Sequence, residues 1–376
     1  MPFIDVRKNY PEKELVLTDF ADVTFIHLNS DNDEYLYKMP IQTLTVTNNT
    51  IAVYDNSSCS ILFFSKDGSP KSRFKRLGQG PEEYISVDHI LYDEKKDDVF
   101  VVASGEYTIK VYSSTGEYKR TIPFPKGENS KSLFFFDNQS FLTYNSKSSV
   151  PKAPFLREKY LSDIPNFTTY YHISKTNGTI LDSLNLPSDK TVNLVKTIPG
   201  SNSYSFSQYY RLIKGMDGFF LCNPETDTIY FYAKDKSVSP VFRKIPSVRD
   251  MDPFVIIHNI LESSRYQFFR IEAIYDEIDR RNARYPHIYY FRDKETGEIY
   301  LQKIILPEYK GKEFQIFVGF KGAGYYGIEN GTAYELDLIE LREAYEENRL
   351  SGKLKELVST LNELKDNNVL MLVHFK

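Results

Sequence analysis

Ile51-Ala-Val-Tyr-Asp55, Ile61-Leu-Phe-Phe64 and the turn Asp67-Gly68 form the stretch of sequence that decides the fold. The apolar and aromatic segments followed by an Asp-Gly turn predict antiparallel strands. Similar units recur along the chain. They are Val99–Ala103 with Ile109–Tyr112 and Thr115-Gly116, Phe141–Asn145 with Tyr170–Ile173 and Asn177-Gly178, Phe219–Asn223 with Ile229–Tyr232 and Lys234-Asp235, and Ile288–Phe291 with Ile299–Leu301 around Thr296-Gly297.

The spacing of these units indicates a propeller. Their turns recur roughly every 50 to 60 residues, which suits one four-stranded blade plus its loops. A sixth unit, Phe314–Val318 with Tyr325–Ile328, lacks outer strands, and Val23–Leu28 and Val369–Phe375 from the two chain ends can supply them. We therefore predict an all-β fold, a six-bladed β-propeller of residues 1–376 in a single domain, in which the N- and C-terminal strands close one blade.

Two regions carry a helical pattern instead. Leucines recur at helical spacing near 337–366, and a weaker pattern lies near 255–283, where Arg270 to Arg284 sits among acidic residues like a salt-bridged helix face. We expect short helical insertions packed on the propeller. A partner-binding face is the alternative, although apolar helical stripes are more often core.

Composition excludes several classes of function. The 29 Tyr and 27 Phe with no Trp favour half-buried strands. The net charge of −4 gives no basic field, so we expect no nucleic-acid partner. No apolar run has the length of a membrane helix, so we expect no transmembrane segment. Cys59 and Cys222 are expected to be buried free thiols.

The segment Arg76-Leu-Gly78-Gln-Gly80-Pro81-Glu82-Glu83-Tyr84 is the most individual part of the sequence. Together with the strands before it, this segment resembles the bacterial 6-bladed β-propeller lipoproteins related to NHL repeats. The resemblance runs from Ile4-Asp5-Val6 to Val369–Lys376. Many members have Gly in place of Glu82 and Pro in place of Asn368. The resemblance implies an extracytoplasmic protein, in the periplasm or at the cell surface and lipid-anchored in its full-length precursor, but supplies no reaction.

The same segment is the candidate site. Gly78 and Gly80 allow unusual backbone angles and Pro81 fixes the next one, so a structural connection between blades is one interpretation. The functional interpretation is that Arg76, Gln79, Glu83 and Tyr84 form a ligand-binding surface at one mouth of the central channel. The two interpretations are compatible.

Other motifs give weaker signals. Gly322-Ala-Gly324-Tyr-Tyr-Gly327 matches a dinucleotide fingerprint but is not followed by a helix pattern. Acidic clusters at Asp31–Glu34 and Asp93–Asp98 lack the glycine and glutamate of a calcium loop, and the histidines lack zinc-site spacing. We therefore predict no catalytic residue, no cofactor and no metal that sequence alone identifies.

The leading functional hypothesis is an exported binding or scaffold module of unknown specificity, monomeric, with a glycan, peptide or protein as partner. Tyrosine-rich loops suit such a role because their rings offer a stacking face and a hydroxyl group. The alternative is a hydrolase or lyase with a site at the central channel, which rests on fold analogy. A structural component of a surface assembly is a third hypothesis, and it predicts a broad apolar patch.

Overall fold

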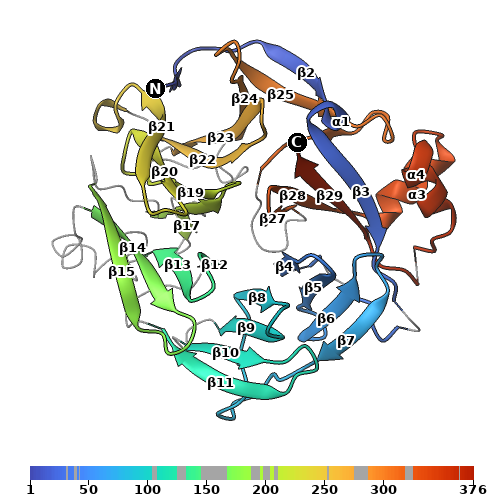
Figure 1. Cartoon of the computed structure of the whole chain (residues 1–376). Coiled ribbons are helices and arrows are strands. Elements are labelled where there is room, and N and C mark those ends of the chain that lie inside the picture. The colour runs from blue at the N-terminus through green and yellow to red at the C-terminus, as the bar shows by residue number, and fades with distance from the viewer. Residues whose placement is uncertain are drawn as a thin grey trace. The chain divides into compact units, whose positions relative to one another are not determined.

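The computed structural model of the chain is built mainly from β-strands (Figure 1). It describes residues 1–30, 33–37, 40–41, 43–103, 108–124, 133–144, 167–187, 195–197, 204–206, 211–251, 254–274, 287–317, 325–363 and 365–376. The chain divides into two compact units. Unit 1 holds Met1–Glu12, Pro125–Leu261 and Tyr266–Leu301, and unit 2 holds Lys13–Phe124, Glu262–Arg265 and Gln302–Lys376.

Two sheets of unit 2 contain the first copies of the repeat. One consists of β4 (Thr43–Val46), β5 (Thr50–Asp55), β6 (Ser60–Ser65) and β7 (Pro70–Phe74), and the other of β8 (His89–Asp93), β9 (Asp98–Ala103), β10 (Thr108–Tyr112) and β11 (Tyr118–Pro123). Both are antiparallel in chain order. Ile51 and Val53 of β5 belong to one buried cluster and Ala52 and Tyr54 to another, so both faces of this strand are covered. Burial on both faces explains its nearly continuous apolar sequence.

The third sheet of unit 2 joins the two ends of the chain. Its strands, in spatial order, are β27 (Tyr325–Ile328), β28 (Gly331–Leu336), β29 (Val369–Phe375) and β3 (Ala21–His27). β3 pairs antiparallel with β29 from Ala21 opposite Phe375 to His27 opposite Val369, so the pairing expected between these segments is present. Tyr325–Ile328 also lies in this sheet, as β27, as predicted, but the other inner strand of the predicted unit was wrong. Phe314 lies in β26 (Glu313–Phe314) of another sheet, and β28, which follows a tight turn at Glu329-Asn330, was not predicted.

Unit 1 contains three sheets of its own. They are β12 (Phe134–Phe135), β13 (Ser140–Tyr144), β14 (Phe167–Ser174) and β15 (Ile180–Pro187); β18 (Leu212–Lys214), β19 (Gly218–Leu221), β20 (Thr228–Ala233) and β21 (Val238–Ile245) with β1 (Phe3–Asp5); and the pair β16 (Val195–Thr197) and β17 (Tyr204–Phe206). β1 pairs parallel with the outer strand β21. It covers an edge that would otherwise present open hydrogen-bonding groups.

The remaining sheet corrects the expected helical insertion near 255–283. Its order is β2 (Glu12–Val16), β25 (Ile299–Ile305), β24 (His287–Asp293), β23 (Tyr266–Ile274) and β22 (Phe254–Glu262), with β26 beside β25. β22 and β23 are strands, and residues 275–286 lie outside the described part of the chain. The helical interpretation failed because Arg270 and Glu272 are buried within β23, whereas it placed them on an exposed polar face.

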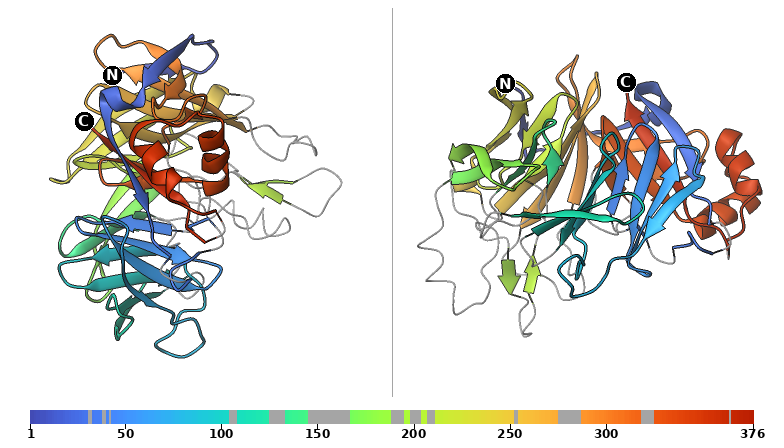
Figure 2. Two further views of the ribbon diagram at one scale, coloured as in Figure 1. Left: turned by 90° about the vertical axis from the view of Figure 1, so that its right-hand side faces the viewer. Right: turned by 60° about the horizontal axis from the view of Figure 1, so that its bottom comes forward.

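In the described part of the chain, helices are few and short. They are α1 (Leu17–Phe20), α3 (Leu338–Glu346), α4 (Gly352–Ser359) and a 3-10 turn at Val248–Asp250. α3 and α4 lie side by side within the expected helical stretch near 337–366 (Figure 2). The Asp337 carboxylate accepts from the amides of Ile339 and Glu340 and so caps α3. In the described residues, no helix is both long enough and apolar enough to span a membrane.

The described residues therefore form six sheets of four or more strands and one two-stranded sheet. Successive strands of most of these sheets follow one another in the chain, so each sheet is largely a local meander.

Candidate functional site

The segment 76–84 connects β7 to β8 in unit 2 and closes on itself through backbone hydrogen bonds. The Tyr84 amide donates to the Arg76 carbonyl at 3.0 Å, and the Gly78 amide donates to the Tyr84 carbonyl at 3.1 Å. Leu77 and Tyr84 thus form an isolated parallel bridge. These bonds hold the two ends of the loop together.

Tyr84 anchors the loop from inside. Its side chain is fully buried and its ring meets that of Tyr112 edge-on at 6.1 Å. The hydroxyl accepts from the Arg76 amide and donates to the Cys59 carbonyl, both at 3.2 Å. Burial raises the pKa of Tyr84 to about 12, so the hydroxyl keeps its proton at neutral pH.

Glu83 supports the loop as well. Its carboxylate accepts from the Gly80 amide at 2.8 Å. A Cβ atom at Gly78 would lie 1.9 Å from Glu83 Oε2, so the absence of a side chain at residue 78 leaves room for this bond. From the neighbouring strand β10, Lys110 and Tyr112 donate to the carbonyls of Pro81 and Glu82 at 2.6 and 2.7 Å.

Arg76 and Gln79 are the exposed members of the predicted site. Arg76 Nε donates to the Gly116 carbonyl at 2.9 Å, a neutral acceptor that orients the guanidinium without cancelling its charge. The structure therefore brings Arg76, Glu83 and Tyr84 together in one loop, in which Tyr84 and Glu83 act on the backbone. Arg76 and Gln79 are left to face solvent.

Removing the Tyr84 hydroxyl tests the anchor. In Tyr84→Phe, the Arg76 amide and the Cys59 carbonyl each lose a hydrogen-bond partner in a buried site. We expect a loss of roughly 1 to 3 kcal/mol in the free energy of unfolding, measured by urea denaturation. Tyr345→Phe, at a half-buried tyrosine of α3, is the control and should change it little. An unchanged urea midpoint in Tyr84→Phe would show that the hydroxyl does not hold the loop.

Sequence reasoning missed a basic strand that leads into this loop. Lys71, Arg73 and Lys75 precede Arg76, and all four side chains are exposed. Leu77 and Ile85, at the two sides of the Leu77–Tyr84 bridge, are 39% and 59% exposed. The signal was available in the sequence, because residues 71–76 hold four cations and no acid.

A buried charged group in unit 1 was also missed. On β23, Arg270 and Glu272 are each 2% exposed, and Arg270 Nη2 lies 3.8 Å from Glu272 Oε2. His287 lies opposite Glu272 on β24, with its Nδ1 3.7 Å from the same oxygen, and its side chain is 29% exposed. The arrangement places a carboxylate behind a histidine that solvent can reach. Sequence could not show it, because the pairing of the two strands creates the proximity.

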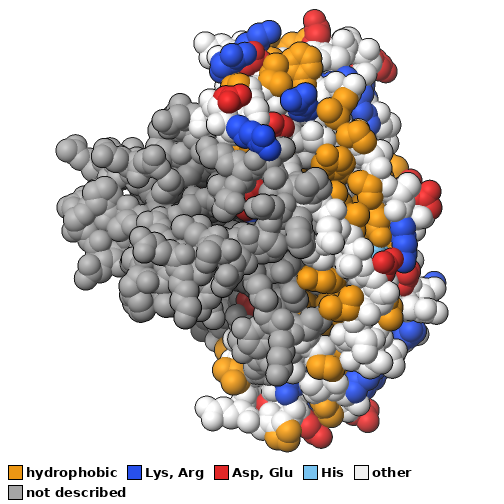
Figure 3. All heavy atoms as spheres, turned by 90° about the vertical axis from the view of Figure 1, so that its left-hand side faces the viewer, with side chains coloured by type: hydrophobic (Ala, Val, Ile, Leu, Met, Phe, Trp, Pro, Cys, Tyr) orange, Lys and Arg blue, Asp and Glu red, His pale blue; other side chains and the backbone are white. Residues whose placement is uncertain are grey.

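The exposed face of unit 1 near β15 and β21 carries a mixture of side chains. Figure 3 shows hydrophobic side chains running between Lys, Arg, Asp and Glu on this face. Ile180, Leu181 and Val238 are among the exposed hydrophobic residues. An ion pair of 2.8 Å joins Asp182 of β15 to Lys236, in the turn that precedes β21. The hydrophobic side chains on this face are thus bordered by charge.

Carboxylates of the acidic cluster at Asp93–Asp98 bind groups within the protein. The Glu94 carboxylate accepts from the Thr50 hydroxyl at 2.6 Å, and Asp98 pairs with Lys119 and Arg120. Among the described residues, no group of three or more His, Cys, Asp or Glu side chains is placed to hold a metal ion. Asp31 and Gly322–Gly324 lie outside the described residues, and Gly327 lies in strand β27 of a hairpin.

The family model described as "Domain of unknown function (DUF4934)" matches residues 1–374. The chain belongs to the DUF4934 family. No curated protein matches the DUF4934 chain.

Two solved structures from Bacteroides resemble the DUF4934 chain in fold. A putative exported protein from Bacteroides fragilis is 16% identical, with a TM-score of 0.61, over 97% of this chain and 98% of that one. A member of the duf4221 family from Bacteroides vulgatus is 13% identical, with a TM-score of 0.50, over 95% and 97%. The DUF4934 chain has an all-β propeller fold, made mostly of strands with few helices.

Proposed function

We propose that this DUF4934 chain is an exported binding or scaffold propeller whose partner contacts Arg76 and Gln79, with Glu83 and Tyr84 as supports of the same site. The observation that carries the proposal is the construction of the 76–84 loop. Its backbone is fixed at both ends while Arg76 and Gln79 remain exposed. A preorganised loop binds with a smaller loss of conformational entropy than a mobile one.

The finer architecture is part of the proposal. We propose one domain of six NHL-like blades, monomeric, in which the pairing of β3 with β29 closes the ring. The six sheets of four or more strands agree with this number of blades. Pairing the two ends of a chain within one sheet removes open strand edges, which favours a protein that does not self-associate.

We further propose an extracytoplasmic location with a lipid anchor on the precursor. The similarity in fold to a putative exported protein supports this location. Fractionation of cells that express the full-length gene tests it. Recovery of the protein in the cytoplasmic fraction would contradict it.

A thermal-shift screen tests the binding role. Glycans, peptides and divalent metals are added to the purified chain, since a ligand that binds only the folded state raises the melting temperature. The screen is repeated on Arg76→Ala/Gln79→Ala, with Lys310→Ala/Glu363→Ala at exposed positions as control. We expect a shift that disappears in the first variant and persists in the control. A shift that survives in both variants would place the binding site elsewhere.

The second candidate function is a hydrolase or lyase. Glu272 behind His287 supports it, because a buried carboxylate can orient a histidine that acts as a general base. A screen of hydrolase and lyase substrates with His287→Asn and His374→Asn tests this function. Activity that disappears only in His287→Asn supports it, and equal activity in both variants would exclude this histidine.

A further inference from the structure

The outer edge of the first sheet of unit 2 carries a dense group of positive charges. Lys71 and Arg73 lie on β7, Lys75 and Arg76 follow it at the start of the loop, and all four are exposed. The chain as a whole has a net charge of −4, so the charge of this group is opposite in sign to the net charge. We call these four residues the basic edge.

Neutral groups hold most of the basic edge in place. Arg73 donates to the Glu34 carbonyl, Arg76 to the Gly116 carbonyl and Lys71 to the Thr50 hydroxyl. In the part of the chain that the structure describes, none of the four lies within ion-pair distance of a carboxylate. Thr50 also donates to Glu94. Burial would raise the pKa of Glu94, but hydrogen bonds, first of all that from Thr50, and the nearby charge of Lys71 lower it. The uncompensated charge therefore lies at Arg73, Lys75 and Arg76.

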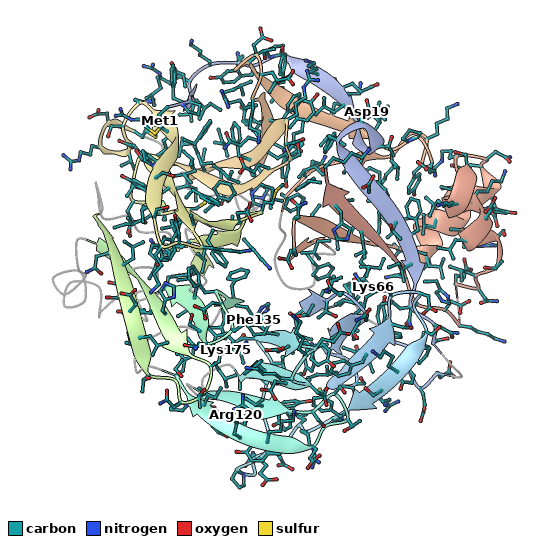
Figure 4. All side chains as sticks on the ribbon, in the orientation of Figure 1. Met1, Asp19, Lys66, Arg120, Phe135 and Lys175 are labelled. Carbon is teal, nitrogen blue, oxygen red and sulfur yellow. The ribbon has the colours of Figure 1, made fainter. Side chains whose placement is uncertain are left out.

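The outer strand of the neighbouring sheet behaves differently. On β11, Lys119 and Arg120 contact the Asp98 carboxylate at 3.0 and 2.8 Å, and Figure 4 labels Arg120 there. Burial alone would raise the pKa of Asp98, but hydrogen bonds from Arg120 and Lys119 outweigh it and lower that pKa. Two cations on one outer strand are thus paired with a carboxylate of the protein, whereas no described carboxylate pairs with the basic edge in this way.

Exposed aliphatic side chains continue the basic edge. Leu77 follows Arg76 directly, and Ile85 lies across the Leu77–Tyr84 bridge. The aromatic residues of this region, Phe74 and Tyr84, are buried, so they offer no face on which a nucleic-acid base or a sugar ring could stack. The surface therefore combines cations with aliphatic groups.

We propose that the basic edge and Leu77 bind an extended acidic peptide segment of a partner protein, an inference that rests on the binding role of Arg76 and Gln79. Alternate side chains of an extended chain are about 7 Å apart. Arg73, near the end of β7, and Lys75, directly after β7, are both exposed and lie on either side of buried Phe74 in the chain. Acidic side chains at alternate positions of the peptide would meet these cations. An aliphatic residue of the peptide would lie against Leu77 and Ile85.

Fluorescence anisotropy with a short labelled peptide of alternating Glu and Thr ending in Leu tests the proposal. Its counterpart with Gln in place of Glu, a sulfated glycan and vesicles of anionic lipid are the comparison probes. We expect binding of the acidic peptide that weakens as salt rises, and weaker or no binding of the other three. Arg73→Gln/Lys75→Gln should weaken peptide binding by about tenfold, and Lys353→Gln/Lys355→Gln, which removes the same charge on α4, should not.

Lys75→Glu is the second variant. Within the described residues, the exposed Lys75 side chain makes no hydrogen bond or ion pair that the substitution would remove. It should abolish peptide binding while leaving the urea midpoint unchanged. Equal binding of the Gln peptide, stronger binding of the glycan or the vesicles, or unchanged affinity in the charge variants overturns the inference. A ligand that depends on Arg76 and Gln79 but not on Arg73 and Lys75 leaves the proposed function standing. If the acidic peptide does not bind and no other ligand depends on Arg76 and Gln79, both the inference and the proposed function are overturned.

Discussion

Gly68→Ala is expected to cause a large loss of stability in unit 2. Gly68 lies in the turn between β6 and β7 with φ of +88°. A Cβ atom there would lie 1.9 Å from the His27 carbonyl oxygen, and the Gly68 carbonyl accepts from the Asn29 amide at 3.0 Å. The backbone at the C-terminal end of β3 must therefore move to make room for a methyl group at residue 68. We expect the free energy of unfolding to fall by about 3 kcal/mol or more, measured by urea denaturation.

Gly311→Ala provides the matched control. Gly311 also has a positive φ, of +81°, but the nearest atom to its added Cβ would be Arg349 Cδ at 4.0 Å. This variant therefore carries only the strain of a left-handed backbone, about 1 kcal/mol. The difference between the two losses of unfolding free energy measures the cost of the steric contact between the Gly68 turn and β3. Equal losses would contradict that approach.

The strands of the repeat could be predicted from sequence because their patterns are local. Ile51–Asp55 and Ile61–Phe64 lie within β5 and β6, and the turn glycines Gly68, Gly116 and Gly178 all have positive φ, which glycine tolerates best. β22 and β23 could not be predicted in the same way. Burial of Arg270 and Glu272 inside β23 depends on neighbouring strands, and a local pattern of charges does not reveal it.

The candidate site was predicted in part. The sequence identified the loop from Arg76 to Tyr84, because two glycines and a proline mark an unusual backbone. The sequence could not show which of the predicted site residues support the loop and which are exposed. Tyr84 bonds to Cys59, which is distant in sequence, and Arg76 bonds to Gly116 of the next sheet. The closeness of Glu272 and His287 likewise depends on the register of β23 against β24.

Asn367 connects three points of unit 2 and is 1% exposed. Its Nδ2 donates to the carbonyls of Leu28 and Tyr35 at 2.7 and 2.9 Å, and its Oδ1 accepts from the Tyr37 amide at 2.9 Å. Two carbonyls on one side and an amide on the other fix the orientation of the side-chain amide. The residue therefore ties the segment after β3 to the start of β29.

Asn367→Asp is expected to disrupt this connection with almost no change in shape. The replacement puts a carboxylate oxygen where Nδ2 donates, so it faces two carbonyl oxygens at hydrogen-bonding distance. The new carboxylate keeps one donor, the Tyr37 amide, but it is buried and its second oxygen faces two carbonyl oxygens. Its pKa is therefore raised, so its unfavourable contribution grows as pH rises above about 4 and is smaller below that value. We expect a loss of about 3 kcal/mol in the free energy of unfolding at neutral pH, and a smaller loss at pH near 4. Asn348→Asp, at an exposed position after α3, should change stability little at either pH. If Asn367→Asp were as stable as the original chain at neutral pH, Asn367 could not be the donor to both carbonyls, and it would not tie the segment after β3 to the start of β29.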